Sequence, residues 1–219
     1  MMAETAQKQA FTCSRCKAVE QVDVYPGVNV AADPQLREKV RDGSLFVWEC
    51  PHCGTRNLAR YPFLYHDPDA KLMVWLLPDG QMLPEAMQEQ LETVSDRLDG
   101  YTLRRVGDVG SLIEKIAIRE ADLEDTVIEM VKYVTRMELI EKNRAKEAAL
   151  IDVPMKFYRM EGPDNEMVLS FPLDGAMHGV HVGFNVYEDC RGILMRNPSV
   201  KPDAGFARID STWISKFFR

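Results

Sequence analysis

The sequence predicts an α+β protein in three parts: an N-terminal β region that includes a hairpin, a helical layer, and a C-terminal antiparallel β meander. In each of the two outer parts, runs of apolar, β-branched and aromatic residues are bounded by Gly, Pro and Asp, a pattern typical of strands and turns. In the middle part, apolar residues recur every three or four positions, as along one face of a helix. Helices and strands are therefore expected in separate segments of the chain, the pattern of the α+β class.

The composition is that of a folded globular chain. Its 219 residues are 46% hydrophobic and 28% charged, which excludes the disordered and fibrous classes. The net charge of -7 argues against binding of nucleic acid or an anionic membrane by bulk electrostatics. Residues 1–10 lack the apolar core of a secretory signal, and the longest apolar stretch, 72–77, is far shorter than the roughly 20 residues that span a bilayer. We expect a cytoplasmic protein without a membrane segment.

The N-terminal β region is expected to hold two strands with a short helix between them. The strands are Val19–Val24 and 44–48, since apolar, β-branched and aromatic residues dominate both. For the helix, Asp33 stands where a capping residue is needed, Pro34 suits the first helical position and Gly43 suits the end.

A hairpin is expected next, formed by the segments 63–65 and 72–77. Pro and Asp residues in the connection 66–70 supply the chemistry of a turn. Because both alternating faces of 72–77 are apolar, we expect this strand to be covered on both sides.

Two helices and a strand are expected in the middle of the chain. The first helix begins at Pro84 and ends at Gly100, and a short strand follows at 101–106. Ser111 and Glu114 have the spacing of a capping box, which begins the second helix. The apolar stripe of the first helix consists of Met87, Leu91, Val94 and Leu98.

The strongest helical pattern of the chain begins at Asp122. Glu138 and Lys142 in it form an i, i+4 pair of the favourable orientation. The apolar face of this helix consists of Leu123, Val127, Met130, Val131, Val134 and Met137. The opposite face, which we expect to be solvated, carries Glu124, Glu129, Lys132 and Arg136.

The last third of the chain changes to the period of strands. Turn residues separate three runs that are expected to pair as an antiparallel meander. Ile209, Trp213 and Phe217 then follow one another at helical spacing and predict a closing amphipathic turn or helix. The expected strands are 155–160, 166–171 and 179–187.

Four of the five cysteines form two C-x-x-C units, which predict a metal site. Two residues between cysteines let one tight turn aim both sulfurs at a point, and two turns complete a tetrahedron with bonds of about 2.3 Å to zinc. Gly54 suits the left-handed conformation that closes such a turn. Because four thiolates leave no open position for water or substrate, the expected ion is a structural zinc. The candidate ligands are Cys13, Cys16, Cys50 and Cys53.

Three other interpretations of these cysteines stay open. In the first, the cysteines are free or redox thiols. In the second, they hold iron, since 50–54 resembles the second knuckle of the rubredoxin family, although the first unit has Lys17 where a matching Gly would stand. In the third interpretation, His52 replaces one sulfur as a ligand, but its place inside a two-residue turn would point it away from the ion. Cys190 stands apart and is expected to be a small buried residue.

The two cysteine units, together with the segments that follow them, resemble the bacterial CpXC family over residues 11–140. The resemblance implies that Cys13, Cys16, Cys50 and Cys53 are the four family cysteines and that they form a metal site; the family has no established activity. Ser14 stands where the family name has Pro, a residue that only rigidifies the turn. The other segments that carry the resemblance are 61–68, 74–78, 103–106, 112–116 and 122–132.

The resemblance and the change of period divide the chain into two predicted domains. Residues 11–147 form a CpXC-like domain with a zinc-ribbon-like β region and helices. Residues 153–219 form a small β-rich module that lies outside the resemblance.

Residues that suggest catalysis have simpler interpretations. His178 and His181 are three apart on an expected strand and so face opposite sides. His66 and Asp67 precede Pro68, where an Asp commonly hydrogen-bonds the backbone of a turn. The carboxylates Glu114, Asp122, Glu124, Asp125 and Glu129 are expected on a solvated face.

Three functions remain, of which the first is favoured. It is a non-enzymatic module, held by structural zinc, that binds a protein partner or a second copy. The second is a ribbon that binds nucleic acid through Arg15, Lys17, Arg56 and Arg60, although acidic residues nearby leave almost no positive field. The third is an enzyme with a site between the helical layer and the C-terminal sheet, for which no catalytic residue is assigned.

Overall fold

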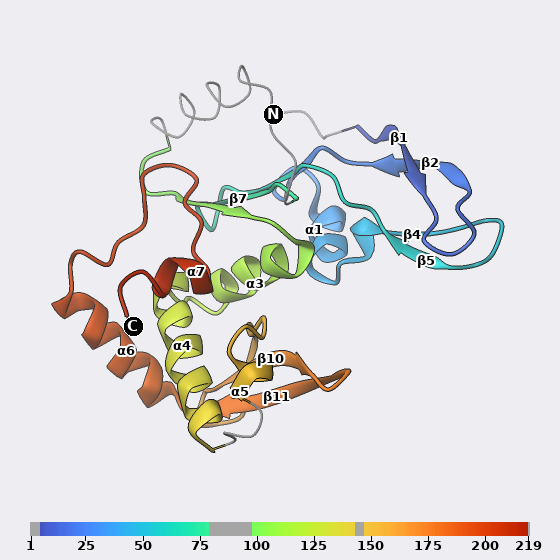
Figure 1. Ribbon diagram of the computed structural model, residues 1–219. Helices are drawn as coiled ribbons and strands as arrows, with labels where there is room; N and C mark the ends of the chain where they lie inside the picture. The colour runs from blue at the N-terminus through green and yellow to red at the C-terminus, as the bar shows by residue number, and fades with distance from the viewer. Residues whose placement is uncertain (1–4, 79–97, 143–146, 219) are drawn as a thin grey trace. The chain divides into compact units, whose positions relative to one another are not determined.

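The computed structural model describes residues 5–78, 98–142 and 147–218 (Figure 1). The chain divides into two compact units, Met1–Ile113 and Glu114–Arg219. The α+β class is confirmed, with several small sheets, an N-terminal cysteine cluster and a C-terminal antiparallel sheet. Among the described helices, none has both the length and the apolar character that crossing a membrane requires. Most of the helix predicted from Pro84 to Gly100 lies outside the described residues.

Two short antiparallel hairpins form the cysteine-bearing part of the first unit (Figure 1). The first joins β1 (Gln7–Thr12) to β2 (Val19–Val24), which has the predicted bounds. The second joins β4 (Val47–Glu49) to β5 (Arg56–Leu58). One C-x-x-C unit lies in the turn of each hairpin, the arrangement expected of a zinc-ribbon-like region.

The first unit also contains a four-stranded mixed sheet. Its order is β3-β6-β7-β8, with β6 antiparallel to β7 and the outer pairs parallel. The predicted hairpin is confirmed, and all five residues of β7 are buried, so that strand is covered on both sides as expected. The strands are β3 (Gly27–Asn29), β6 (Phe63–Asp67), β7 (Leu72–Leu76) and β8 (Thr102–Val106).

The predicted helix α1 (Pro34–Arg41) is present, but the strand expected at 44–48 is wrong in its first half. Ser44–Phe46 form a 3-10 turn, and β4 begins only at Val47. The reason lies in Gly43, whose φ of 76° ends the helix and turns the chain sharply. Asp33 occupies the capping position without a capping hydrogen bond from its side chain.

The second unit combines helices with the predicted antiparallel meander, in the order β11-β10-β9. Helix α3 (Val109–Glu120) leads into it from the first unit. The other helices are α4 (Asp125–Lys142), α5 (Glu147–Leu150), α6 (Phe184–Arg196) and α7 (Ser211–Ile214). The strands are β9 (Lys156–Glu161), β10 (Glu166–Leu173) and β11 (Ala176–Val182).

The third predicted strand, 179–187, is wrong after Val182, because helix α6 begins at Phe184. Gly183 is still extended, at φ −62° and ψ 148°, and is the last residue before the helix. Alternation over 182–186 suits a strand, but Phe184, Tyr187 and Cys190 also recur every three residues, as along one helix face, and Tyr187 and Cys190 are buried. The Tyr187 hydroxyl accepts the backbone N–H of Glu124 at 2.9 Å, a distant contact that favours the helix.

Two helices begin elsewhere than predicted. The carboxylate of Asp108, not Ser111, caps α3, since it accepts hydrogen bonds from both the N–H and the hydroxyl of Ser111. Helix α4 begins at Asp125 because Asp122 has a φ of 55°, which is incompatible with an α-helix. The ion pair of Glu138 with Lys142 is confirmed at 3.4 Å.

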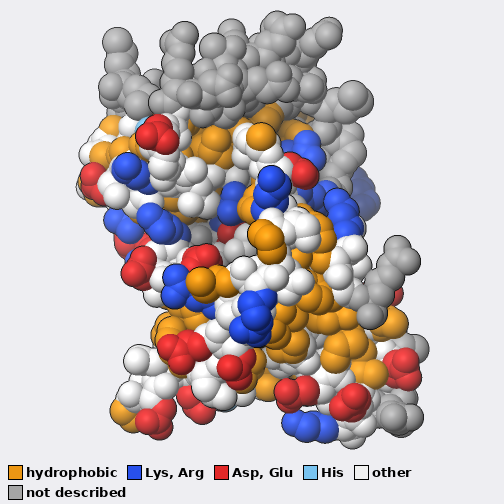
Figure 2. Space-filling view, turned by 90° about the vertical axis from the view of Figure 1, so that its left-hand side faces the viewer, with side chains coloured by type: hydrophobic (Ala, Val, Ile, Leu, Met, Phe, Trp, Pro, Cys, Tyr) orange, Lys and Arg blue, Asp and Glu red, His pale blue; other side chains and the backbone are white. Residues whose placement is uncertain are grey.

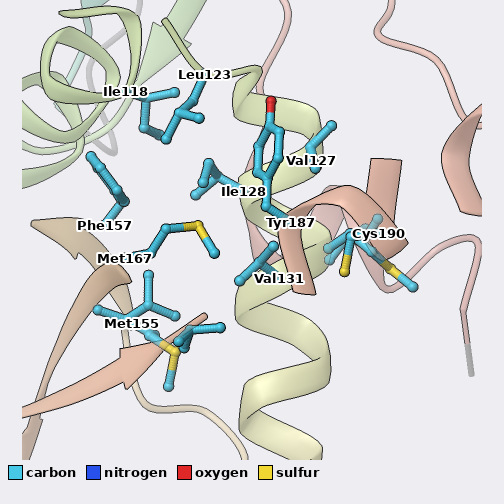
Figure 3. Packing of buried hydrophobic residues seen from close by; sticks show 14 of the residues in the cluster. Ile118, Leu123, Val127, Ile128, Val131, Met155, Phe157, Met167, Tyr187 and Cys190 are labelled. Carbon is cyan, nitrogen blue, oxygen red and sulfur yellow. The ribbon is translucent and has the colours of Figure 1, made fainter. Parts of the chain in front are cut away.

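The core of the second unit lies between α4 and the C-terminal segments. Figure 3 shows Ile128 of α4 and Met167 of β10 pointing toward one another, with Phe157 of β9 beside them. Tyr187 and Cys190 of α6 belong to the same cluster. Helix α4 therefore packs with the segments after 153, within the compact unit that begins at Glu114. The domains 11–147 and 153–219 stay a prediction.

The prediction of a solvated face on the helix that is now α4 is wrong for its central residues. Glu129, Lys132 and Arg136 are only 2%, 5% and 8% exposed, and the carboxylates of Glu114 and Asp125 are buried as well. The prediction failed because a charged helix face is usually solvated. Here another helix supplies opposite charges, which allow this face to be buried.

Ion pairs hold the buried charges other than Arg136. The ammonium of Lys132 lies 2.8 Å from Glu114 Oε1 and 2.6 Å from Glu129 Oε1. The ammonium of Lys115 lies 2.9 Å from Asp125 Oδ2. Glu114 also accepts the backbone N–H of Phe157 at 2.7 Å, which joins α3 to β9. We call Glu114, Lys115, Asp125, Glu129 and Lys132 the buried ionic cluster.

Candidate metal centre

The two C-x-x-C turns have the same backbone structure. In the first, the N–H of Cys13 donates to Ala18 O, and the N–H of Lys17 donates to Cys13 O. In the second, Cys50 and Gly54 make the equivalent bonds, to Thr55 O and Cys50 O. Lys17 and Gly54 close the turns with φ values of 65° and 67°. Lys17 therefore adopts the conformation that Gly adopts in the second turn, and the absence of Gly from the first unit does not change its shape.

The structure brings the four predicted ligands together. All four sulfurs lie within 4.8 Å of one another. The Sγ atoms of Cys13 and Cys53 are 3.6 Å apart, and those of Cys16 and Cys50 are 3.5 Å apart. A tetrahedron with bonds of about 2.3 Å to its centre has edges of about 3.8 Å, so the spacing suits one tetrahedral ion. Each unit contributes two sulfurs, and each short contact joins one hairpin to the other.

Asn57 links the two turns, and sequence reasoning missed it. Its Oδ1 accepts the backbone N–H and the hydroxyl of Ser14, both at 2.8 Å. Its Nδ2 donates to Thr55 O at 2.8 Å and lies 3.7 Å from Cys13 Sγ. Asn57 is buried. The local signal was an amide directly after the second turn, but its partner Ser14 is far away in sequence.

The surroundings of the cysteine thiols shift their pKa values in different directions. Burial raises the pKa of Cys50 to about 12. The backbone N–H of Cys16 is the largest of several causes that lower the pKa of Cys13 to about 6, and hydrogen bonds with Thr55 lower the pKa of Cys53. A cation that binds thiolates deprotonates such a group outright, so ligation removes the difference. The donor set therefore fits a soft or borderline cation such as zinc or iron.

His52 is not part of this cluster. Its Nε2 pairs with Glu20 Oε1 at 2.8 Å, and its side chain is 63% exposed, so the turn points it away from the sulfurs as expected. Cys190 is also distant; it is buried in α6, where burial raises the pKa of its thiol to about 11.

The histidines singled out in the sequence do not form a site. Asp67 Oδ1 accepts the backbone N–H of Ala70, which confirms its role in the turn. His66 Nε2 lies 3.3 Å from the Tyr101 hydroxyl, and burial lowers the pKa of the imidazole. His178 stacks on Phe171, whereas His181 lies near two glutamates, so the two histidines share no ligand position.

Comparison with known proteins places this chain in a family. No curated protein and no solved structure matches it. The family model described as "CpXC protein" matches residues 11–132, which is more than half of the chain and contains all four clustered cysteines. The chain therefore belongs to the CpXC family.

Proposed function

We propose that this chain is a non-enzymatic protein-interaction module whose four-cysteine centre holds a structural zinc ion. The observation that carries the zinc proposal is the convergence of four sulfurs from two hairpins. Four thiolates complete a tetrahedral coordination sphere, so no position is left for a substrate or an activated water. The role of such an ion is to join the hairpins, which are too short to bury a core of their own.

Exposed apolar side chains support a protein partner. On the hairpins, Val19 is 63% exposed and Leu58 is 48% exposed, and each follows a cysteine turn. Figure 2 shows apolar side chains gathered on one face of the molecule. Contiguous apolar surface is typical of protein–protein interaction sites. Large exposed apolar side chains of the second unit are Ile151, Tyr158, Met177, Met195 and Phe217.

Metal content tests the first half of the proposal. Elemental analysis of the untagged protein, with an absorption spectrum, should find one zinc per chain and no visible band. If the protein instead contains iron and shows visible charge-transfer bands, the bound metal is iron, and electron transfer becomes the favoured function. Cys50→Ser should lose the metal, whereas Cys190→Ser should keep it, since Cys190 is outside the cluster. Absence of any metal from the protein as purified under reducing conditions would overturn the proposal.

Cross-linking in the native cell tests the second half. The wild-type chain is compared with a Val19→Glu/Leu58→Glu variant, which places charge on the exposed apolar positions without touching the cysteines. We expect one defined partner, or a second copy of the chain, to be lost from the variant only. A control variant, Lys8→Glu, changes charge on the same hairpin at an exposed ion pair. Identical partners for all three proteins, or none for the wild type, would contradict this surface as the binding site. Salt-sensitive binding to random DNA or RNA would instead favour the nucleic-acid function.

A further inference from the structure

The second unit contains an open cavity of about 440 Å³ that no part of the proposed function uses. It lies between α4, the segment after α5, and α7. Its walls combine apolar side chains, among them Tyr133, Met137 and Ile151, with a set of hydrogen-bond donors. This combination of an apolar wall with a few polar groups is typical of small-ligand sites.

Arg136 is the buried donor of this cavity. The residue is 8% exposed, yet its hydrogen bond to Val153 O at 3.1 Å satisfies one of five N–H donors. Nε is buried and has no hydrogen-bond partner among the described residues. Glu129 and Asp152 act on Arg136 only at a distance, since within the described chain neither forms an ion pair with it. A buried guanidinium with unmatched donors is costly unless something else binds it.

Further hydrogen-bond donors line the same cavity from α7 and from the two residues that follow it. Lys216 supplies a second cation, and Ser211 and Thr212 supply hydroxyls that make no hydrogen bond within the described part of the chain. Ser215 donates its hydroxyl hydrogen to Ser211 O at 2.7 Å, so its oxygen is oriented by α7. Asp152 is the acidic residue of the lining. Two cations against one carboxylate leave a positive balance.

We propose that this cavity binds a small organic anion, with its oxyanion held by Arg136 and Lys216 and its apolar part against Tyr133, Met137 and Ile151. Planar guanidinium groups suit carboxylates and phosphates equally well, because both present two oxygens to the fork. The shared chemistry is thus an oxyanion on an apolar body. The site does not use the metal or the hairpins, so it stands independently of the proposed function.

An NMR titration of the full-length, metal-loaded protein tests this site. Benzoate, phenyl phosphate and inorganic phosphate are added at constant ionic strength, and amide shifts of residues 211–216 are followed. We expect saturable shifts there for at least one aromatic anion, and weaker binding of inorganic phosphate because it lacks the apolar part. Tighter binding of phenyl phosphate identifies a phosphate ester as the natural class; tighter binding of benzoate identifies a carboxylate.

Variants of exposed lining residues keep the test independent of folding. Lys216→Gln should weaken binding about tenfold or more, as expected for loss of a charged hydrogen bond. Ile151→Asp should weaken it too, because it places a negative charge in the lining. Lys201→Gln removes an exposed lysine that does not line the cavity and should bind as the wild type does. Absence of saturable shifts with all three anions, or equal affinity of Lys216→Gln and wild type, would overturn the proposal.

Discussion

The cysteine hairpins and the second unit contain polar groups that are stabilised in different ways. In the hairpins, four sulfurs converge from two turns that each follow a local pattern of two cysteines. In the second unit, three carboxylates and two lysines are buried by helices that pack together. The first arrangement could hold an ion from outside the chain, whereas the second supplies its own counter-charges. A polar cluster is therefore recognisable from sequence only where local geometry creates it.

Removal of the metal should have the largest effect and should be confined to the hairpins. Structural zinc contributes on the order of 10–16 kcal/mol in small zinc-binding peptides, and these hairpins have few buried apolar residues. Hydrogen exchange with and without a chelator measures the effect. Amides of β1, β2, β4 and β5 should lose protection, while those of β9 to β11 keep it. Unchanged protection of the hairpins would show that the metal does not hold them together.

Lys132→Met should destabilise the second unit by about 3–5 kcal/mol, because it leaves the buried Glu114 and Glu129 without their shared cation. The matched control is Lys142→Met on the same helix, where an exposed pair contributes about 0–1 kcal/mol. Urea unfolding of both variants measures the difference. Equal stabilities would mean that the cluster relaxes or admits water when the lysine is removed.

Alkaline pH should remove the same contribution. The carboxylates of Glu114 and Glu129 raise the pKa of Lys132 above its ordinary value, against the opposite effect of burial. A raised pKa in the folded state means that the stabilisation is fully present below the unfolded value of about 10.4 and is lost as pH rises above it. The stability difference between wild type and Lys132→Met should therefore be constant from pH 7 to pH 9 and shrink above about pH 10.4. A difference that stays constant into that range would contradict the raised pKa.

Asn57→Ala should weaken metal binding by about 10- to 100-fold, the usual cost of losing a residue that orients a ligand. The side chain joins Ser14 of one turn to Thr55 of the other and lies beside the Cys13 sulfur. Competition with a chromophoric chelator measures the affinity. Ser14→Ala, which keeps the backbone bond to Asn57, should have a smaller effect. Wild-type affinity of Asn57→Ala would show that the two hairpins orient the sulfurs without it.

Lys17→Gly should have the smallest effect and should stabilise the metal-loaded hairpins by about 1 kcal/mol. A left-handed L-residue costs about 1–2 kcal/mol, which glycine avoids, although the Lys17 side-chain bond to Ser14 O is lost. Gly54→Ala at the equivalent position should be destabilising. Thermal unfolding of the metal-loaded proteins measures both. A Lys17→Gly variant that is less stable than the wild type, or a Gly54→Ala variant that is as stable, would contradict the equivalence of the two turns.

Features that depend only on neighbouring residues were predictable from the amino-acid sequence. Two residues between cysteines determine how one turn aims its sulfurs, and the alternation in β7 or the spacing in α4 determines which side chains share a face. Turn chemistry at Asp67 and Gly43 is local in the same sense. These features were predictable because backbone geometry over a few residues settles them.

Tertiary structure decided what depends on residues distant in sequence. The residues after Val182 contain both the alternation of a strand and the three-residue apolar spacing of a helix, and packing in the core of the second unit favours the helix. Glu114 and Lys132 are both charged residues on amphipathic helices, and only their juxtaposition allows them to be buried. Asn57 joins the metal turns through Ser14 for the same reason. In each case the free energy comes from a partner that the local sequence does not contain.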